Sequence, residues 1–291
     1  AAGIDNDTGC TMTTYGVMFR REWPANRLID YARQVEAHDL DEMWVVEDLT
    51  FHGGFTQATA ALAATTRINV GIGIAPAVVR NVAYTAMEIA TLAQMFPGRF
   101  HMGFGHGVDF WIEQVGAVPP SWLSSLRETV VATTRLLAGD NVTIDGAYVH
   151  LDAVQLAHPA RVVPPISLGV RGPRSMALAA EVGVGVIFAE WSGPRYLQQV
   201  RAQIGEAPKF TAFVQASADV DSLEAMMAEK MALPRFANQL AAYGDEAVPL
   251  DELVIAGDPV TWIEQAQRWV AAGASTVVFC PLPTDPVELP L

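Results

Sequence analysis

The segment Thr66–Gly107 constrains the fold more than any other part of the chain. Its sequence, TRINVGIGIAPAVVRNVAYTAMEIATLAQMFPGRFHMGFGHG, predicts a strand at Ile68–Ile74, an apolar helix at Ala83–Phe96 and a second strand at Phe100–Phe104. A strand, a helix and a strand in succession form the βαβ unit of parallel sheets. Both strands run into glycine-rich or proline-marked sequence, so backbone is exposed at the same end of two parallel strands. In α/β barrels, ligands bind at that end.

The alternation of strands and helices continues through the rest of the chain. Further strands are predicted at Tyr15–Phe19, Met43–Glu47, Ile166–Val170, Val184–Phe188, Phe210–Ala216 and Thr276–Cys280. Further helices are predicted at Ala25–His38, Thr56–Thr65, Trp122–Ala138, Ser175–Val182, Leu223–Tyr243 and Pro259–Ala272. Eight strands separated by helices favour an α/β fold of the (β/α)8 TIM-barrel type over an open sheet.

Two segments depart from this repeat. Asn141–Leu151 contains two short strands around Asp145-Gly146, the sequence of a type I′ hairpin, and we interpret it as an insertion on the barrel. After the last strand only PLPTDPVELPL remains, so we expect the eighth barrel helix to be short, missing or replaced, with apolar surface left for a partner subunit. We expect residues 1–13 to form a flexible tail and residues 14–291 a single domain.

Composition excludes several classes of function. The net charge of −14 disfavours nucleic-acid binding, which needs a basic surface. No apolar run reaches the roughly 18 residues of a membrane span, and no secretory signal is present near the first residue. Cys10 and Cys280 belong to no C-x-x-C or His/Cys cluster, so we expect neither a disulfide framework nor a metal site. A cytoplasmic location fits this pattern.

Polar residues follow the predicted ends of several strands and are the candidates for catalysis: Asp48, His52, His106, Asp109 and Glu190. Asp48 is the first choice for proton transfer, because a pocket carboxylate whose pKa is raised by burial can act as a general acid or base. A salt bridge to an arginine is the alternative for Asp48 and for its neighbour Glu47. Adjacent strand residues point to opposite sides, so only one of these two carboxylates is expected to face the pocket unless the strand end turns.

Aromatic residues also follow strand ends, namely Phe19, Phe51, Phe110, Trp111 and Trp191. Some of these are expected in the core. Together they predict an apolar cavity for an organic substrate.

Gly172-Pro173-Arg174-Ser175 follows a predicted strand and begins a helix. Free backbone N–H groups and the helix dipole make such a terminus an anion site, and Pro173 fits the first turn. Arg171 or Arg174 could add a charge-assisted bond to a phosphate. An ordinary helix cap with solvated arginines is the alternative.

Five motifs, in the same order along the chain, resemble the bacterial luciferase-like family of flavin and deazaflavin oxidoreductases. They are Glu47-Asp48 in WVVEDL, the strand VGIGIAP, Pro97-Gly98-Arg99 followed by Gly103-Phe104-Gly105-His106-Gly107, Gly172-Pro173-Arg174-Ser175, and Gly257-Asp258-Pro259 followed by Ala272-Gly273-Ala274. The resemblance covers nearly the whole predicted fold, from Tyr15 to Pro281.

The resemblance implies a bulge within Gly71–Ile74 that carries a non-proline cis peptide, at Ile72–Gly73 or one bond away, and supports the flavin ring. A plain buried strand, with glycine easing close packing, is the alternative. The cofactor-binding residues that follow from the resemblance and from the anion site are Glu47, Ile72, Gly73, Ile74, Gly105, His106, Gly107, Arg171, Gly172, Pro173, Arg174 and Ser175. For His106 the alternative is a structural histidine.

The chain also departs from the family pattern. Asp48 stands where the deazaflavin-dependent sugar-phosphate dehydrogenases of the family have a histidine, His52 occupies roughly the place of their tryptophan, and Asp109 follows the glycine motif. The substrate chemistry of that subgroup is therefore not carried over.

The function that this resemblance implies is hydride transfer between the deazaflavin coenzyme F420 and a small organic substrate. The alternatives are an FMN-dependent two-component monooxygenase and a flavin-binding protein without catalysis. A separate flavin or deazaflavin reductase could supply reduced cofactor. We also expect a homodimer that buries Ala83–Phe96, because this helix is apolar on nearly every face.

Overall fold

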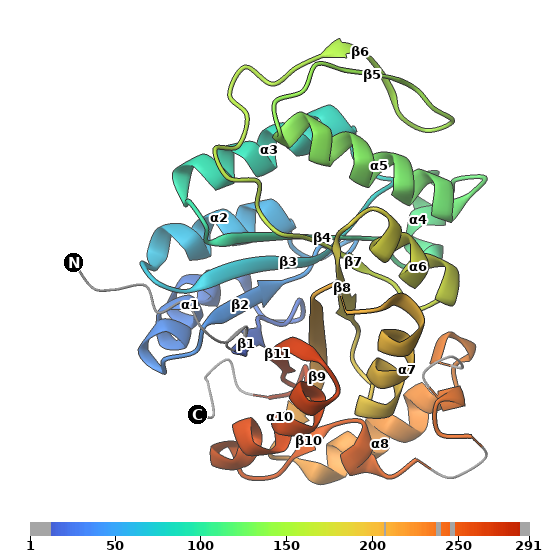
Figure 1. Ribbon diagram of the computed structural model, residues 1–291. Coiled ribbons are helices and arrows are strands. Elements are labelled where there is room, and N and C mark those ends of the chain that lie inside the picture. The colour runs from blue at the N-terminus through green and yellow to red at the C-terminus, as the bar shows by residue number, and fades with distance from the viewer. Residues whose placement is uncertain (1–12, 207, 237–239, 245–247, 286–291) are drawn as a thin grey trace, which may run out of the picture.

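The structure, a computed structural model, describes residues 13–206, 208–236, 240–244 and 248–285. Eight parallel strands form a closed barrel, in the order β1, β2, β3, β4, β7, β8, β9 and β11 (Figure 1). Each strand pairs with the next one in this order, and β11 pairs with β1. The barrel strands are β1 Thr14–Met18, β2 Glu42–Val45, β3 Asn69–Pro76, β4 Phe100–Gly105, β7 Ile166–Gly169, β8 Gly185–Phe188, β9 Phe210–Ser217 and β11 Ala274–Cys280. The predicted TIM barrel is confirmed.

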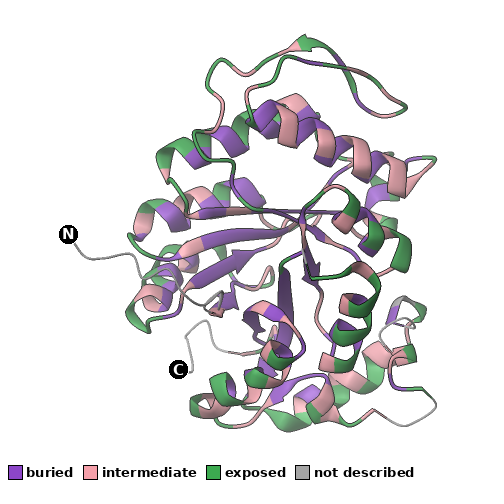
Figure 2. Cartoon of the chain, in the orientation of Figure 1, coloured by how far each residue is buried: buried purple, intermediate pink, exposed green. Residues whose placement is uncertain are grey.

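Helices surround the barrel and turn their exposed faces outward, while the strands are almost wholly buried (Figure 2). They are α1 Leu28–Ala37, α2 Gly54–Ala64, α3 Val82–Met95, α4 Asp109–Gln114, α5 Trp122–Leu137, α6 Pro173–Glu181, α7 Pro194–Ile204, α8 Val220–Met231 and α10 Trp262–Ala271. Shorter elements are the 3-10 helices Ala25–Arg27, Pro234–Phe236, Leu250–Glu252 and Pro259–Thr261, and the strand β10 Ile255–Ala256 beside β9.

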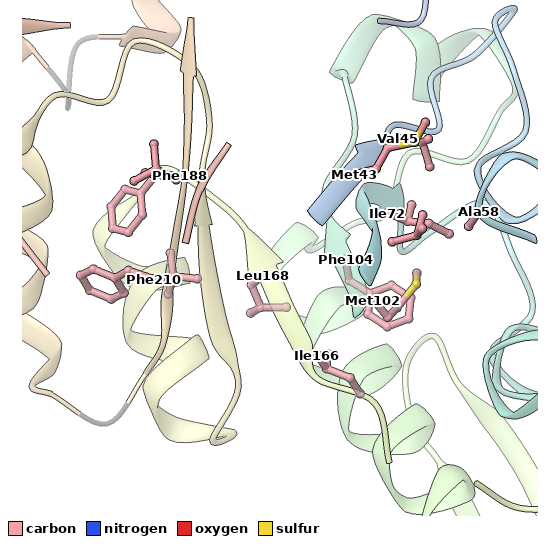
Figure 3. Packing of buried hydrophobic residues seen from close by; sticks show 14 of the residues in the cluster. Met43, Val45, Ala58, Ile72, Met102, Phe104, Ile166, Leu168, Phe188 and Phe210 are labelled. Atoms are coloured by element: carbon pink, nitrogen blue, oxygen red, sulfur yellow. The ribbon is translucent and has the colours of Figure 1, made fainter. Parts of the chain in front are cut away.

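The main hydrophobic core lies between the strands and the helices. Because side chains alternate along a strand, every second residue faces outward into this layer. Met43, Ile72, Met102 and Leu168 are such residues, and all are fully buried (Figure 3). Burying each of these side chains contributes roughly 1.5–3 kcal/mol, which makes this layer the chief source of stability.

The barrel interior contains polar side chains that are paired with one another. Trp44 donates a hydrogen bond from Nε1 to Glu42 Oε2 at 2.8 Å, and burial raises the pKa of Glu42. His101 Nε2 lies 2.8 Å from Ser167 Oγ, and its ring packs against Trp44. Burial, with a smaller effect of Lys209, lowers the pKa of His101 to about 4.

Strand β3 contains the bulge that the family resemblance implies. Ile72 pairs with Met102, but the next partners are Ala75 and Phe104, so β3 has one residue more than β4 over this stretch. The Gly73–Ile74 peptide bond is cis, one bond beyond Ile72–Gly73 and within the predicted interval.

The sequence analysis missed two helices and extended a third too far. Helix α4 was not predicted, nor was α7, although Pro194 at its first position and Leu197 and Val200 one turn apart are signals for α7. The helix predicted at Leu223–Tyr243 ends at Met231, ahead of Pro234, because proline disfavours helical geometry in the residue before it.

The hairpin β5 Val142–Asp145 and β6 His150–Val154 is present and lies over α5, at the top of Figure 1. The predicted type I′ turn is wrong: Asp145 pairs with His150, so residues 146–149 form the connection, and neither Asp145 nor Gly146 has a positive φ. The reason is Glu128 of α5, whose carboxylate accepts hydrogen bonds from the N–H groups of Ala147, Tyr148 and Val149.

Parts of two predictions lie outside the described residues. The tail at residues 1–13 is described only at Thr13, and the segment after β11 only as far as Asp285, so the expectation about the eighth helix stays a prediction. Within the described ranges, no helix has both the length and the apolar character needed to cross a membrane.

The buried imidazole generates a pH prediction. The unfolded chain takes up a proton at His101 near pH 6.5, whereas the folded protein does so only near its pKa of about 4. The free energy of unfolding should therefore fall as pH drops from about 6.5 to about 4, by up to about 3 kcal/mol from this residue. The free energy of unfolding, measured with urea at a series of pH values, should fall less steeply between pH 6.5 and about 4 in His101→Gln than in the wild type. The exposed His38→Gln is the control, and an equally steep fall in His101→Gln would contradict the prediction.

Candidate functional site

The bulge places Ile74 inside the mouth of the barrel. A β-carbon built on Gly105 would lie 3.0 Å from Ile74 Cγ1, one on Gly103 would lie 3.3 Å from Ile74 Cγ2, and one on Gly169 would clash with the same side chain. These glycines on β4 and β7 leave the space that the Ile74 side chain occupies. Ile74 remains partly exposed and forms an apolar surface at the carboxyl end of the barrel.

A cavity of about 430 Å³ lies beside this surface, among the loops that follow β2, β3 and β4. Its volume lies within the range of small-molecule pockets. Its lining consists of residues 47–53, Pro76, Val78, Val79, Val108, Trp111, Ile112, Val115 and Ala117. Glu47 N–H donates to the Ile74 carbonyl at 3.2 Å, which joins the wall of the cavity to the bulge.

Glu47 and Asp48 both line this cavity, which corresponds to the case in which the strand end turns and the restriction of strand register no longer applies. Strand β2 ends at Val45, and the strict alternation of side chains ends with it. Glu47 binds Arg80 through both oxygens, at 2.9 and 3.1 Å, and Asp48 is ion-paired with Arg21. The salt-bridge alternative therefore holds for both carboxylates.

The surroundings of Asp48 nevertheless raise the pKa of its carboxyl above the usual value for an aspartate. Burial raises its pKa, the Arg21 guanidinium lowers it, and Glu190 and Glu22 raise it further, with a net increase. Across the mouth, Glu190 accepts a hydrogen bond from Arg20 at 3.3 Å. The acidic and basic groups that follow β1, β2 and β8 thus form one network at the barrel mouth.

The two predicted histidines have different surroundings. His52 lines the cavity, but its Nε2 is 2.9 Å from the carbonyl oxygen of Trp23, which is a structural contact. His106, at the end of β4, has Nε2 3.4 Å from Ser175 Oγ in the first turn of α6. Burial lowers the pKa of His106, while nearby Asp109, which is exposed, raises it.

The predicted anion site is the amino terminus of α6. Gly172 is the N-cap and Pro173 occupies the first turn, and no side chain caps the helix. A β-carbon on Gly172 would have no atom within 4 Å, so the space beside this terminus is open. The helix dipole and the first-turn N–H groups favour a negative charge there. The carbonyl of Arg171 accepts a hydrogen bond from Tyr196, which fixes the loop before the helix.

The predicted aromatic residues divide between the cavity and the core. Phe51 and Trp111 line the cavity, and Phe110 packs on Trp111. Phe19 and Trp191 are buried in apolar clusters away from it.

The sequence analysis missed three arginines. Arg20 and Arg21 follow β1, and Arg80 follows β3, so each occupies the kind of strand-end position that identified the carboxylates. Arg21 also packs on two rings, with Cζ 4.9 Å from the Phe51 centroid and 5.2 Å from the Trp111 centroid.

A closed parallel barrel with a bulged third strand, and with polar residues gathered at the carboxyl ends of its strands, defines the class of (β/α)8 barrel proteins to which this chain belongs. The luciferase-like monooxygenase family model matches residues 7–276, and the chain belongs to this family.

Curated relatives are reductases and dehydrogenases. A 5,10-methylenetetrahydromethanopterin reductase of Methanolobus tindarius is 29% identical over 196 residues, which cover 67% of this chain and 60% of that protein. The alignment thus leaves a substantial part of that relative unmatched. An F420-dependent glucose-6-phosphate dehydrogenase of Mycobacterium avium is 25% identical over 280 residues, which cover 86% of this chain and 82% of that protein.

Solved structures with the same fold include proteins of both cofactor types. An F420-dependent secondary alcohol dehydrogenase, in complex with an F420-acetone adduct, aligns with a TM-score of 0.77 at 21% identity and covers 93% of each chain. The oxygenating constituent of the 3,6-diketocamphane monooxygenase of Pseudomonas putida, in complex with FMN, aligns with a TM-score of 0.69 at 18% identity over 92% of this chain and 91% of that one. At these identities the likeness shows the fold alone.

The open terminus of α6 generates a prediction about Gly172→Glu. The backbone at Gly172 has φ −85°, which any residue adopts, and a side chain has room, so the variant should fold with an unchanged melting temperature. Its carboxylate would compete with a phosphate for the helix terminus, and the affinity for F420 or FMN, which both carry phosphate, should fall at least tenfold. Gly172→Ala is the matched control and should bind normally. Equal affinities of the Glu and Ala variants, measured by fluorescence titration, would exclude this terminus as the phosphate site.

Proposed function

We propose that this protein is an oxidoreductase that binds the deazaflavin coenzyme F420 and transfers a hydride between it and a small organic substrate. The observation that carries the proposal is the position of His106. It follows the strand beside the Ile74 bulge, and its ring reaches Ser175 at the start of α6, so a surface for a flat ring and a terminus for a phosphate adjoin each other.

The residues present fit such a cofactor. The glycines of β4 and β7 keep backbone close to the apolar surface of Ile74, and the terminus of α6 has neither a capping side chain nor a neighbour at Gly172. When bound, the deazaflavin supplies a hydride donor or acceptor at one ring carbon. Ile74 would support the ring, and Arg174 and Ser175 would hold the phosphate. His106 would lie between the ring and the phosphate.

Asp48 is the proposed proton-transfer group of the chain. Its buried carboxyl, with a raised pKa, retains a proton to higher pH than an ordinary aspartate, as a general acid near neutral pH requires. Arg21 holds this carboxyl in one orientation. The apolar side chains that line the cavity would limit the access of water to the reacting atoms.

The comparisons support a deazaflavin in particular, since one of the two curated relatives described above, the glucose-6-phosphate dehydrogenase, is F420-dependent by name. The names of the two relatives differ in substrate, a methanopterin in one and a sugar phosphate in the other, so they do not identify the substrate of this chain. The second candidate, an FMN-dependent monooxygenase, is supported by the family description, which is that of luciferase-like monooxygenases. A non-catalytic flavin-binding protein is the third.

Two further expectations stay predictions. Helix α3 has three large apolar side chains on its outer face, Tyr84, Met87 and Met95, which are 71%, 51% and 57% exposed and support a homodimer through this helix. The second expectation is that a separate reductase supplies the reduced cofactor.

Titration with both cofactors tests the proposal. Coenzyme F420 should bind with a Kd at least tenfold below that of FMN, as followed by cofactor fluorescence. Tighter binding of FMN would favour the monooxygenase, and binding of neither would refute both candidates.

The role of Asp48 is tested by Asp48→Asn. An amide cannot transfer the proton but keeps the shape of the side chain, so turnover of a carbonyl compound that the wild type reduces should fall by about 10²-fold or more, with cofactor affinity unchanged. Asp140→Asn, which removes an ion-paired aspartate near the hairpin, is the control and should turn over normally. Normal turnover in Asp48→Asn would make Asp48 structural, and His106 would be the next residue to test.

A further inference from the structure

The lining of the 430 Å³ cavity is predominantly apolar. Most of its side chains beyond residues 47–53 are aliphatic or aromatic, including Val78, Val108, Trp111 and Ile112. Among the described residues that form this lining there is no lysine or arginine. A molecule that carries a carboxylate or a phosphate would therefore lose its hydration inside the cavity without gaining a lysine or arginine partner from the wall.

The mouth of the cavity exposes apolar side chains to solvent. Phe51, Val79 and Val115 line the cavity and are 39%, 40% and 48% exposed. Phe110, which packs on Trp111, is 54% exposed. Large apolar side chains gathered around one opening are typical of a site that collects an apolar ligand.

The nearby cations are already neutralised. Arg21 is ion-paired with Asp48 and packs on the rings of Phe51 and Trp111. Arg80 binds Glu47 through two hydrogen bonds and also binds Glu88. Glu47 and Asp48 line the cavity, so an anion bound there would have to compete with their carboxylates for Arg80 and Arg21.

We infer that this cavity binds an uncharged, largely apolar organic molecule and discriminates against anionic molecules of the same size. That this molecule is the substrate rests on the proposed function. A neutral carbonyl or hydroxyl group is the chemical class that fits, because it can accept a proton or a hydrogen bond near Asp48 while the rest of the molecule contacts valine and tryptophan side chains.

A pair of probes with the same ring system separates charge from shape. The neutral ketone 2-acetylnaphthalene and the anion 2-naphthoate should be titrated calorimetrically into the full chain, first alone and then with coenzyme F420 bound. The ketone should bind at least tenfold more tightly than the naphthoate. Equal or tighter binding of the naphthoate, or binding of neither probe, overturns the inference.

Matched variants locate the binding. Val79→Asp adds a charge to the lining and should weaken ketone binding at least fivefold, and Val115→Asp should do the same from the end of α4. Val163→Asp is the control, because Val163 is 37% exposed, close to the 40% of Val79, and precedes β7 at the other end of the barrel. If all three variants bind the ketone alike, the molecule binds elsewhere and the inference fails. Circular dichroism confirms that each variant is folded.

The two proposals can fail separately. If the protein does not bind F420 but still binds the ketone more tightly than the naphthoate, the proposed function is refuted and the inference about the cavity stands. Normal F420 binding without ketone discrimination would refute the inference alone.

Discussion

The packing of Ile74 against glycines of the neighbouring strands is the contact on which the barrel mouth depends. One extra residue in β3 turns Ile74 into the barrel, where Gly103, Gly105 and Gly169 leave space for it. A larger residue at Gly169 would clash with that side chain, because interiors are close-packed. The apolar surface at the mouth, the position of Glu47 beside it and the adjoining cavity all follow from this arrangement.

Electrostatics organise the residues above that surface. Each cavity carboxylate has an arginine from a different loop, Arg80 for Glu47 and Arg21 for Asp48, and Arg20 holds Glu190. Partly buried pairs of this kind orient side chains more than they stabilise the fold, because desolvation offsets much of the Coulomb attraction. At Asp48, burial outweighs the pairing with Arg21 and raises the pKa of the carboxyl, which connects the fold of the loops to the chemistry proposed for it.

The alternation of strands and helices and the start of α6 could be predicted because each depends on local sequence, and Gly172-Pro173 marks the helix start. The bulge in β3 was expected from the family resemblance of VGIGIAP, since Gly71 and Gly73 by themselves also fit a plain buried strand. One error arose where a distant side chain decided the outcome. Glu128, on α5, replaced the expected turn after Asp145 by a longer one, and no pattern within the hairpin reveals this.

The sequence by itself determined the alternation of strands and helices, and with it the barrel and the end at which its polar residues collect, because hydrophobic periodicity and glycine and proline positions are local properties. Only the tertiary structure decided which of those residues meet. In the folded chain, Asp48 pairs with Arg21 and Glu47 pairs with Arg80. His106 lies beside Ser175, the His52 ring contacts the Trp23 carbonyl, and Trp191 is buried in an apolar cluster. These contacts join residues far apart in the chain, and their geometry is set by the closure of the barrel and the packing of its loops.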